Sequence, residues 1–398
     1  MLSFREALDL LLQHTPVLSA ESCRIEQASG RVLREEIRAD RAFPPFERVM
    51  MDGYALRAGD WLAGQRSFRV TGCAPAGQAG IALSEEAGTC VEVMTGAPLP
   101  MGADSIVPIE EIARSGTDGI TLSGSFKPVA GRFIHRSGSD ASAADILLRP
   151  PTLLGSRQIG VAASCGAAWI KVSRLPRIAV IATGDELVAV DEQPAAHQIR
   201  QSNAHAITCA LRRAGYAPQH VGTLGDDSDK FAEVLRQQLT ACDWLVLTGA
   251  VSKGGRDFIP AVLDAIGCTR LFHGVAQRPG KPAGCWLGPA GQVIMALPGN
   301  PVSALTGLHT MVLPALAVAS GLPLAKRRVV MVAGGLDGLP GMTHHLPVTL
   351  RDDGRVEAAA TGNSGDFIGL LKSDGFVTLP PRSASLGISA ALPFTPWL

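Results

Sequence analysis

Residues 243–258 combine a short apolar run with a loop suited to binding an anionic ligand. The run over 244–247 predicts a buried strand, and a glycine-rich loop with Lys253 and Arg256 follows it. Glycine leaves backbone N–H groups free to face an anion, and the two cations add positive charge. Asp257 stands where either a helix N-cap or a metal-holding carboxylate is expected. A Walker phosphate loop and a dinucleotide-binding turn are both excluded, because their glycine, lysine and hydroxyl spacings are absent.

Polar or glycine-rich loops follow four other predicted strands in the same half of the chain. The carboxyl ends of parallel strands meet at one edge of an open α/β sheet, where such folds bind ligands. Five loops that converge there are hard to explain by turn chemistry alone, so a ligand site is predicted at this edge. The other four loops are Thr183-Gly184-Asp185-Glu186-Leu187, Gly225-Asp226-Asp227-Ser228, Arg278-Pro279-Gly280-Lys281-Pro282 and Pro298-Gly299-Asn300-Pro301.

Three segments in the N-terminal half hold further candidates. Residues 43–55 and 93–104 are rich in proline and glycine, which is typical of turns. Three apolar residues directly before Asp52, however, indicate that its carboxylate lies in a partly desolvated site. Residues 131–140 include Arg136 and other cations, which either face an anionic ligand or belong to a solvated loop.

Composition excludes several classes of function. Lysine plus arginine equals aspartate plus glutamate, 36 against 36, so no global field favours nucleic acid or an acidic membrane surface. The eight cysteines form no Cys-x-x-Cys pair, which favours reduced thiols in a cytosolic protein. The N-terminus does not resemble a signal peptide, and no apolar run is expected to span a bilayer. A soluble, cytoplasmic protein is therefore expected, with neither nucleic acid nor membrane as partner.

The predicted fold is a multidomain α/β protein. Strands alternate with helices from Arg177 onward, which indicates a central, doubly wound, mainly parallel sheet. Short strands and glycine turns elsewhere predict two smaller β regions. The domains are expected to be a discontinuous mixed N-terminal domain (1–41 and 139–175), an inserted β-rich domain (42–138), the α/β domain (176–322) and a C-terminal β-barrel-like domain (323–398).

Several helix boundaries carry explicit signals. Ser3 and Glu6 match a capping box at the start of a first helix. A helical or mixed stretch is expected over 25–38, and a helix over 145–166. Ser202 is expected to cap a helix that runs to Arg213. A long apolar helix over 302–319 is expected to kink at Pro314.

Six motifs, in order and nearly end to end, resemble the molybdopterin molybdenumtransferase family, which includes the E domain of gephyrin. Each motif is moderately specific, and the six together are very specific. They are Met51-Asp52-Gly53-Tyr54-Ala55 after Pro-x-Phe, 94–104 with Thr95, Thr183-Gly184-Asp185-Glu186-Leu187, Thr248-Gly249-x-Val251-Ser252, Pro279-Gly280-Lys281-Pro282, and Pro298-Gly299-Asn300-Pro301-Val302-Ser303.

The resemblance implies that molybdenum from molybdate enters adenylylated molybdopterin with release of AMP. It implies an elongated homodimer in which Asp52 and Thr95 reach the partner's α/β domain as catalytic residues, and it suggests a molybdopterin adenylyltransferase and molybdoenzymes as partners. Glu186, Asp226 and Asp257 are then the catalytic carboxylates that hold Mg²⁺, although Asp226 or Asp227 is equally suited to cap a helix. The substrate-binding residues would be Thr183, Gly184, Asp185, Ser202, Thr248, Gly249, Ser252, Lys253, Gly280, Lys281, Pro298, Gly299, Asn300, Pro301, Ser303 and Arg136.

Several positions depart from the family pattern. Val49 replaces a small hydroxyl residue, Ala250 a glycine and Lys253 a small apolar residue, and Gln201 stands where an aspartate is common. Near the C-terminus, Asp366 and His345 fall where a hydroxyl and an arginine are expected to hold an oxyanion, and a carboxylate beside molybdate is repulsive. Two alternatives therefore remain open: a divergent relative that handles another oxyanion metal or hydrolyses a pyrophosphate, and a non-catalytic cofactor carrier.

Overall fold

The computed structural model describes residues 1–115, 118–225, 227–249, 258–359, 363–381, 386–387 and 390–398. The chain forms two compact units. The larger unit comprises Met1–Arg34, Pro151–Gly155 and Ile170–Leu398, and the smaller unit comprises Glu35–Pro150 and Ser156–Trp169. The chain was predicted to contain four domains. Since the structure divides into two compact units, the four domains and their boundaries stay predictions.

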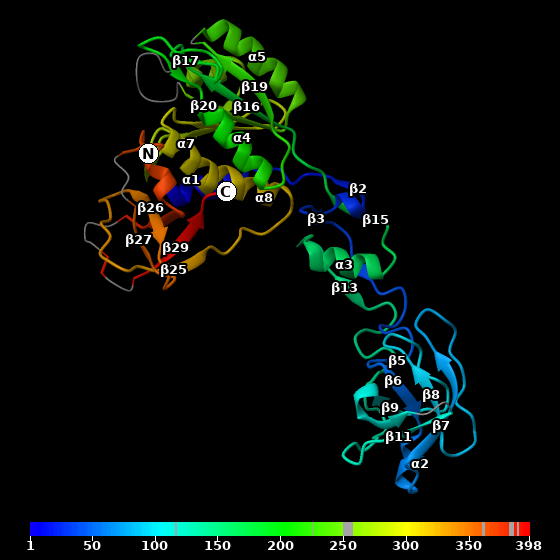
Figure 1. Ribbon diagram of the computed structural model, residues 1–398. Coiled ribbons are helices and arrows are strands. Elements are labelled where there is room, and N and C mark those ends of the chain that lie inside the picture. The colour runs from blue at the N-terminus through cyan, green and yellow to red at the C-terminus, as the bar shows by residue number, and fades with distance from the viewer. Residues whose placement is uncertain (116–117, 226, 250–257, 360–362, 382–385, 388–389) are drawn as a thin grey trace. The chain divides into compact units, whose positions relative to one another are not determined.

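A six-stranded sheet organises the larger unit (Figure 1). The three pairings that join β19, β16, β20 and β24 are parallel, and the two that add β23 and β21 are antiparallel. In sheet order the strands are β19 (Gln219–Leu224), β16 (Ile178–Thr183), β20 (Trp244–Thr248), β24 (Val293–Leu297), β23 (Gly284–Leu287) and β21 (Thr269–His273). The sheet is thus mainly parallel, as predicted.

Helices cover both faces of this sheet because its strands alternate their side chains between two cores. Val180 and Val246 pack towards one core, while Ile181 and Leu247 pack towards the other. Helices α1 (Phe4–Gln13), α4 (Asn203–Arg213), α7 (Pro301–Gly307) and α8 (Leu313–Ala319) contribute to the first core. Helices α5 (Ser228–Ala241) and α6 (Ile259–Ala265) contribute to the second.

Helices α7 and α8 form one helical run with a π-helical segment, Leu308–Val312, between them. Pro314 explains that segment, because proline provides no N–H and its ring crowds the carbonyl four residues earlier. The expectation that no run is long enough to span a bilayer was wrong: Pro301–Ala319 has the length and apolar composition. However, 72% of its apolar window is buried inside the protein, as in the core helix of a soluble protein.

The helix signals were mostly confirmed. Ser3 and Glu6 form the predicted capping box. Ser202 is the N-cap of α4, but its side chain makes no capping hydrogen bond within the described part of the chain. Asp227 caps α5, since its carboxylate accepts from the N–H groups of Asp229 and Lys230. The capping role that Asp226 and Asp227 both suited therefore belongs to Asp227.

Two predicted stretches resolve into shorter elements. Residues 25–38 are mixed: a 3-10 turn, Ile25–Gln27, precedes β3 (Val32–Leu33) and β4 (Ile37–Arg38). The helix expected over 145–166 is wrong in its first half, where β13 (Ile146–Leu148) and β14 (Thr152–Leu153) lie. Pro150 and Pro151 prevent a helix there, so α3 covers Ser156–Ser164. A four-stranded sheet joins β14, β3, β15 (Trp169–Ser173) and β2 (Ala20–Arg24).

The C-terminal segment forms a seven-stranded sheet that also recruits strands from elsewhere in the larger unit. Strand β22 (Val275–Arg278) pairs in parallel with both β1 (Leu2–Ser3) and β26 (Thr343–Leu350). The sheet continues through β28 (Gly375–Leu379), β29 (Ala391–Pro396) and β25 (Arg328–Met331), while β27 (Val356–Ala358) also pairs with β26 and a 3-10 turn covers Gly369–Lys372.

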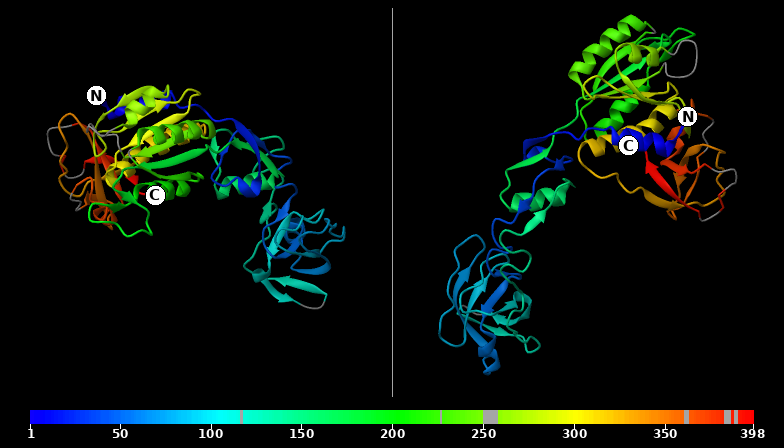
Figure 2. Two further views of the ribbon diagram at one scale, coloured as in Figure 1. Left: turned by 90° about the horizontal axis from the view of Figure 1, so that it is seen from above. Right: turned by 180° about the vertical axis from the view of Figure 1, so that it is seen from behind.

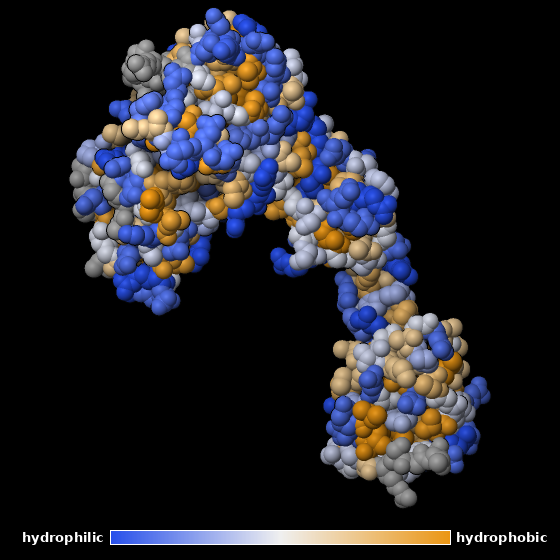
Figure 3. Space-filling view, turned by 45° about the horizontal axis from the view of Figure 1, so that its top comes forward, coloured by the Kyte–Doolittle hydropathy of each residue, from blue (hydrophilic) through white to orange (hydrophobic). Residues whose placement is uncertain are grey.

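The smaller unit is built on a six-stranded sheet (Figure 2). In sheet order the strands are β10 (Ile112–Ser115), β11 (Gly119–Leu122), β7 (Ser67–Ala74), β8 (Thr89–Val93), β6 (Gly53–Leu56) and β9 (Ser105–Pro108). The unit also contains short helix α2 (Ala58–Leu62), helix α3 and a 3-10 turn (Ile109–Glu111). Strand β5 (Arg48–Val49) pairs with β12 (Ile134–His135), and β4 pairs with β13. Its surface exposes large apolar side chains, including Met50, Met101 and Ile109, and Figure 3 shows apolar patches on this unit.

Candidate functional site

A pocket of about 760 Å³ lies at the carboxyl ends of β16, β20 and β24. Predicted strand-end loops supply most of its wall, and further residues come from the segment that leads into α4 and from the C-terminal segment. Its lining residues include Thr183, Gly184, Glu186, Leu187, Arg200, Gln201, Ser202, Asn203, Thr248, Gly249, Gln277, Arg278, Pro279, Gly280, Lys281, Pro282, Pro298, Gly299, Asn300, Pro301, Ser303, Met342, Ser364 and Gly365.

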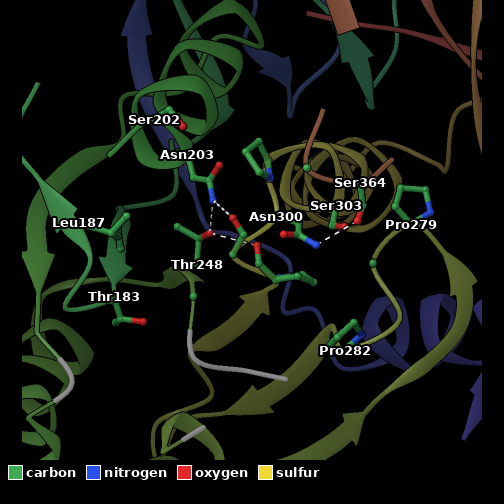
Figure 4. Close-up of a pocket in the computed structure, with 18 of the residues that line it drawn as sticks. Thr183, Leu187, Ser202, Asn203, Thr248, Pro279, Pro282, Asn300, Ser303 and Ser364 are labelled. Carbon is green, nitrogen blue, oxygen red and sulfur yellow. Dashed lines mark hydrogen bonds between the residues drawn. The ribbon is translucent and has the colours of Figure 1, made fainter. Parts of the chain in front are cut away.

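Asn203 joins three of these loops. Its side-chain amide donates to the Thr248 hydroxyl at 3.1 Å and to the Gly299 carbonyl at 2.7 Å (Figure 4). Thr248 in turn donates to the Pro298 carbonyl at 3.3 Å. The start of α4 and the ends of β20 and β24 are thereby fixed relative to one another.

Ser364 attaches the C-terminal segment to the same edge. The Asn300 side chain donates to the Ser364 hydroxyl at 3.0 Å, and the Val302 N–H donates to its carbonyl at 3.3 Å. The hydroxyl therefore reaches the pocket next to the start of α7. Asp366 does not line the pocket; its carboxylate accepts from the Gly369 N–H at 2.8 Å and so holds a 3-10 turn. The expected repulsion between Asp366 and a bound oxyanion is thus not supported by its position.

Two glycines allow the strand ends to approach closely. Gly249 has a φ of +108°, and a Cβ there would overlap the Thr183 carbonyl oxygen. Gly184 has a φ of +148°, and a Cβ there would meet the Glu186 carboxylate. Gly249 requires glycine because a side chain would clash with backbone, whereas at Gly184 the positive φ is the main reason, since the Glu186 side chain is free to shift.

The electrostatics of the pocket favour an anion. Among the described residues, the charged side chains that line the pocket are three cations and one carboxylate. They are Arg200, Arg278, Lys281 and Glu186. Helices α4 and α7 begin at the pocket, and neither Ser202 nor Asn300 caps them with its side chain in the described structure. Uncapped N-terminal N–H groups and the helix dipole both attract negative charge. An anionic ligand at this edge would therefore find both charge and hydrogen-bond donors.

Two family models match separate parts of the chain. Residues 2–166 match the family described as "MoeA N-terminal region (domain I and II)", and residues 179–318 match "Probable molybdopterin binding domain". A Synechocystis sp. protein named molybdopterin molybdenumtransferase is 33% identical, with both chains covered completely.

The chain belongs to the molybdopterin molybdenumtransferase family. A second member, from Synechococcus elongatus, is 35% identical over 79% of this chain and 80% of its own. A crystal structure of a molybdopterin biosynthesis MoeA protein from Pyrococcus horikoshii OT3 superposes over both whole chains, with a TM-score of 0.82 and 25% identity. These matches confirm the expected multidomain α/β fold and a transferase of molybdenum cofactor biosynthesis.

Most of the predicted site residues of the larger unit line the pocket. They are Thr183, Gly184, Glu186, Ser202, Thr248, Gly249, Gly280, Lys281, Pro298, Gly299, Asn300, Pro301 and Ser303. Asp185 instead lines an adjoining pocket. Ser252, Lys253, Asp226 and Asp257, as well as the substituted Ala250, lie outside the described residues. The sequence patterns assigned no role to Arg200 or Asn203, and they included Arg278 in a predicted loop without a role of its own.

Asp52 and Thr95 form a pair inside the smaller unit. One Asp52 carboxylate oxygen accepts from the Thr95 N–H at 2.6 Å and from its hydroxyl at 2.8 Å. The backbone hydrogen bond and then the hydroxyl hold the pKa of Asp52 below its ordinary value. The carboxylate is exposed and ionised, so it is available to a substrate or a cation. Arg136 also belongs to the smaller unit. The predicted roles of these three residues stay predictions.

His345 does not occupy an oxyanion site. It is fully buried, with its ring 4.8 Å from Phe4 and 5.7 Å from Phe376, and it does not line the pocket. Burial lowers its pKa to about 3, and nearby Arg327 contributes. The placement of His345 as a replacement for an oxyanion-binding arginine was therefore wrong. Arg278, whose backbone pairs with His344, lines the pocket.

Proposed function

We propose that this chain inserts molybdenum from molybdate into adenylylated molybdopterin and releases AMP. The observation that carries the proposal is the cationic pocket at which the N-termini of α4 and α7 begin without side-chain caps. A substrate with a pyrophosphate link needs such a combination of backbone donors and cations. The names of the two cyanobacterial relatives support the same reaction.

Lys281 and Arg278 are proposed to bind the phosphates, together with the Ser303 N–H, since Pro301 has no N–H and the Val302 N–H is bonded to Ser364. Arg guanidinium and Lys ammonium groups both suit phosphate oxygens. Ser303, Asn300 and Ser364 supply neutral hydrogen-bonding groups at the same turn. These groups are suited to orient the phosphoanhydride and molybdate before cleavage.

Mg²⁺ is proposed as the cation that neutralises charge during phosphoanhydride cleavage. Glu186 would hold it with Asp226 and Asp257. Glu186 fits this role, since its oxygen-donor side chain lines the pocket. The other two carboxylates lie outside the described residues, and the described residues contain no cluster of three or more His, Cys, Asp or Glu side chains suited to a metal.

The active protein is proposed to be a cytoplasmic homodimer in which the partner subunit donates Asp52 and Thr95 to the pocket. Asp52 then serves as an acid, a base or a positioning group. Asp52 and Thr95 belong to the smaller unit, whereas the pocket lies in the larger unit, and this separation supports the proposal. A molybdopterin adenylyltransferase is proposed to supply the substrate, and molybdoenzymes to receive the product.

The test is incubation of the full chain with adenylylated molybdopterin, Mg²⁺ and molybdate, with tungstate in a parallel reaction. We expect AMP release that depends on the oxyanion, and activation of a cofactor-free molybdoenzyme by the product. AMP release without activation would show a pyrophosphate hydrolase instead. Tight binding with neither outcome would show a carrier protein. Omission of Mg²⁺ should lower the rate if the metal assignment is right.

A further inference from the structure

A second pocket, of about 610 Å³, adjoins the main pocket within the larger unit. Gly184, Leu187 and Gln201 line both pockets, so the two are immediate neighbours. An elongated ligand with two different ends fits such a pair better than a compact one. Adenylylated molybdopterin, the substrate proposed above, is elongated in this way.

The two pockets differ in charge. The main pocket presents Arg200, Arg278 and Lys281, whereas no lysine or arginine lines the second pocket in the part of the chain that the structure describes. The second pocket instead includes Asp185 and Glu192. Phosphate groups are therefore attracted to the main pocket, and a neutral group is better suited to the second.

Two imidazole rings give the second pocket a surface for a flat ring. His205 on α4 and His220 on β19 are in edge-to-face contact, with centroids 5.2 Å apart. Burial and then the neighbouring His205 lower the pKa of His220, so this ring is neutral at pH 7. Leu187 and Val188 add apolar surface. Neutral aromatic and apolar side chains are typical of sites that bind planar heterocycles.

Gln201 is the polar group at the junction. Its residue is 3% exposed, and both Nε2 and Oε1 are buried without a hydrogen-bond partner in the described structure. A buried amide with neither group bonded is costly, and its presence calls for an explanation. A carboxamide offers a donor beside an acceptor, which matches the amino group and adjacent ring nitrogen of adenine.

We propose that Gln201 is a specificity residue that recognises the adenine ring of the substrate in the second pocket, while the phosphates bind in the main pocket. This inference rests on the proposed function, because it assigns one end of that substrate. It assigns Gln201 a role in binding and none in the chemical step.

The test compares AMP with purine riboside 5′-monophosphate, which lacks the exocyclic amino group but keeps the same phosphate. Calorimetric titration of the full chain should show that AMP binds about tenfold more tightly or better. Gln201→Met, which is similar in size and apolar, should abolish this preference and leave the affinity for the amino-free nucleotide unchanged. Gln201→Glu, which offers acceptors alone when ionised, should also lose it.

Gln237→Met is the matched control, because Gln237 is an exposed residue of α5 that lines neither pocket. Its preference for AMP should equal that of the wild type, and thermal unfolding should show that all three variants are folded. The inference is overturned if the wild type binds both nucleotides equally, or if Gln201→Met keeps the preference. It is also overturned if Gln201→Met lowers the affinity for both nucleotides equally, since Gln201 would then merely shape the pocket.

Titration with molybdopterin that lacks the adenylyl group tests whether the pterin end of the substrate binds in the second pocket. A loss of affinity confined to this ligand in Gln201→Met would place the pterin in the second pocket and overturn the adenine assignment. None of these titrations requires molybdate. Failure of the inference is therefore distinguishable from failure of the proposed function, which is judged by molybdate-dependent AMP release in the wild type.

Discussion

Gly249 illustrates how much a single residue controls at this site. Its backbone approaches the end of β16 so closely that a methyl group would overlap the Thr183 carbonyl oxygen, and its φ of +108° is unfavourable for any other residue. The close approach of the ends of β16 and β20 therefore depends on the absence of a side chain at this position.

Gly249→Ala should lower the free energy of unfolding by about 2–3 kcal/mol, because a steric clash adds to the backbone strain. It should also weaken nucleotide binding, since the loops after β16 and β20 would separate. Urea unfolding and AMP titration measure the two effects.

Gly291→Ala provides the control for this substitution. Gly291 also has a positive φ, +83°, but a Cβ there meets nothing within 4 Å. Its cost should be about 1 kcal/mol, from backbone strain alone. Equal losses of stability in the two variants would argue that the clash at Gly249 is relieved by small shifts.

At the scale of elements, Asp243 fixes the start of β20. Its carboxylate accepts from the Arg174 guanidinium at 2.6 and 2.9 Å and from the Arg177 N–H at 2.8 Å. Despite an opposing contribution from burial, these hydrogen bonds hold the pKa of Asp243 well below its ordinary range. The central strand is thus tied to the chain that leads into β16, at the sheet edge opposite the pocket.

Asp243→Asn should lower the free energy of unfolding by about 2 kcal/mol at pH 7, because it removes charge-assisted hydrogen bonds. A depressed carboxyl pKa stabilises the fold above the unfolded value of about 3.9, and this contribution is lost as the pH falls towards the folded pKa. The stability difference between wild type and variant should therefore be constant above about pH 5 and shrink below about pH 4. Urea unfolding at several pH values measures it.

Asp353→Asn is the control for this charge effect, since Asp353 pairs with Arg355 through an exposed contact. Exposed pairs contribute little, so the control should change stability far less than Asp243→Asn. A pH-independent difference between the wild type and Asp243→Asn would contradict the assigned role of the carboxylate.

His345 lies where α1 contacts β26, and it predicts a pH dependence of stability that comes from a buried base instead of a carboxylate. Burial lowers the pKa of His345 to about 3 from an ordinary value near 6.5. Between these values the unfolded chain binds a proton at this site that the folded chain does not, so stability rises with pH in this window. The contribution should approach about 1.4 kcal/mol per pH unit.

His345→Leu removes this titration and is expected to flatten the dependence of stability on pH between about 3 and 6.5. The measurement is the urea midpoint of wild type and variant at matched pH values. His14→Leu, at an exposed position, serves as the control for the exchange of histidine for leucine. An unaltered slope in His345→Leu would show that the ring is accessible to protons in the folded protein.

At the scale of the whole molecule, the proposed dimer predicts complementation between two inactive variants. Asp52→Ala and Glu186→Ala should each abolish molybdate-dependent AMP release. If the partner subunit supplies Asp52, a mixed dimer contains one intact site and one that lacks both residues. Random re-pairing of equal amounts should then restore roughly a quarter of the wild-type rate, since half of the dimers have one working site of two.

Each variant alone, taken through the same unfolding and re-pairing procedure, is the control. Circular dichroism should confirm that both are folded. Absence of any recovery, with mixed dimers demonstrated by a size tag, would show that Asp52 serves the pocket of its own subunit.

The sequence by itself determined much of the larger unit. The apolar run over 244–247 and its counterparts predicted the strands, and the polar loops after them predicted the edge where the pocket lies. These features depend on short-range physics: the length of an apolar run, the placement of glycine and the alternation of strands with helices. The motifs in those loops also indicated the family that the comparisons show.

The tertiary structure alone decided which side chains line the pocket and which enter the core. His344 and His345 are adjacent on β26, but successive residues of a strand point to opposite faces, so the register determines that His345 enters the core. In the same way, capping bonds turn Asp366 away, whereas Ser364 and Arg278 reach the pocket through contacts between distant segments. Local patterns fix which elements form, but pairing between elements far apart in sequence fixes where each side chain points.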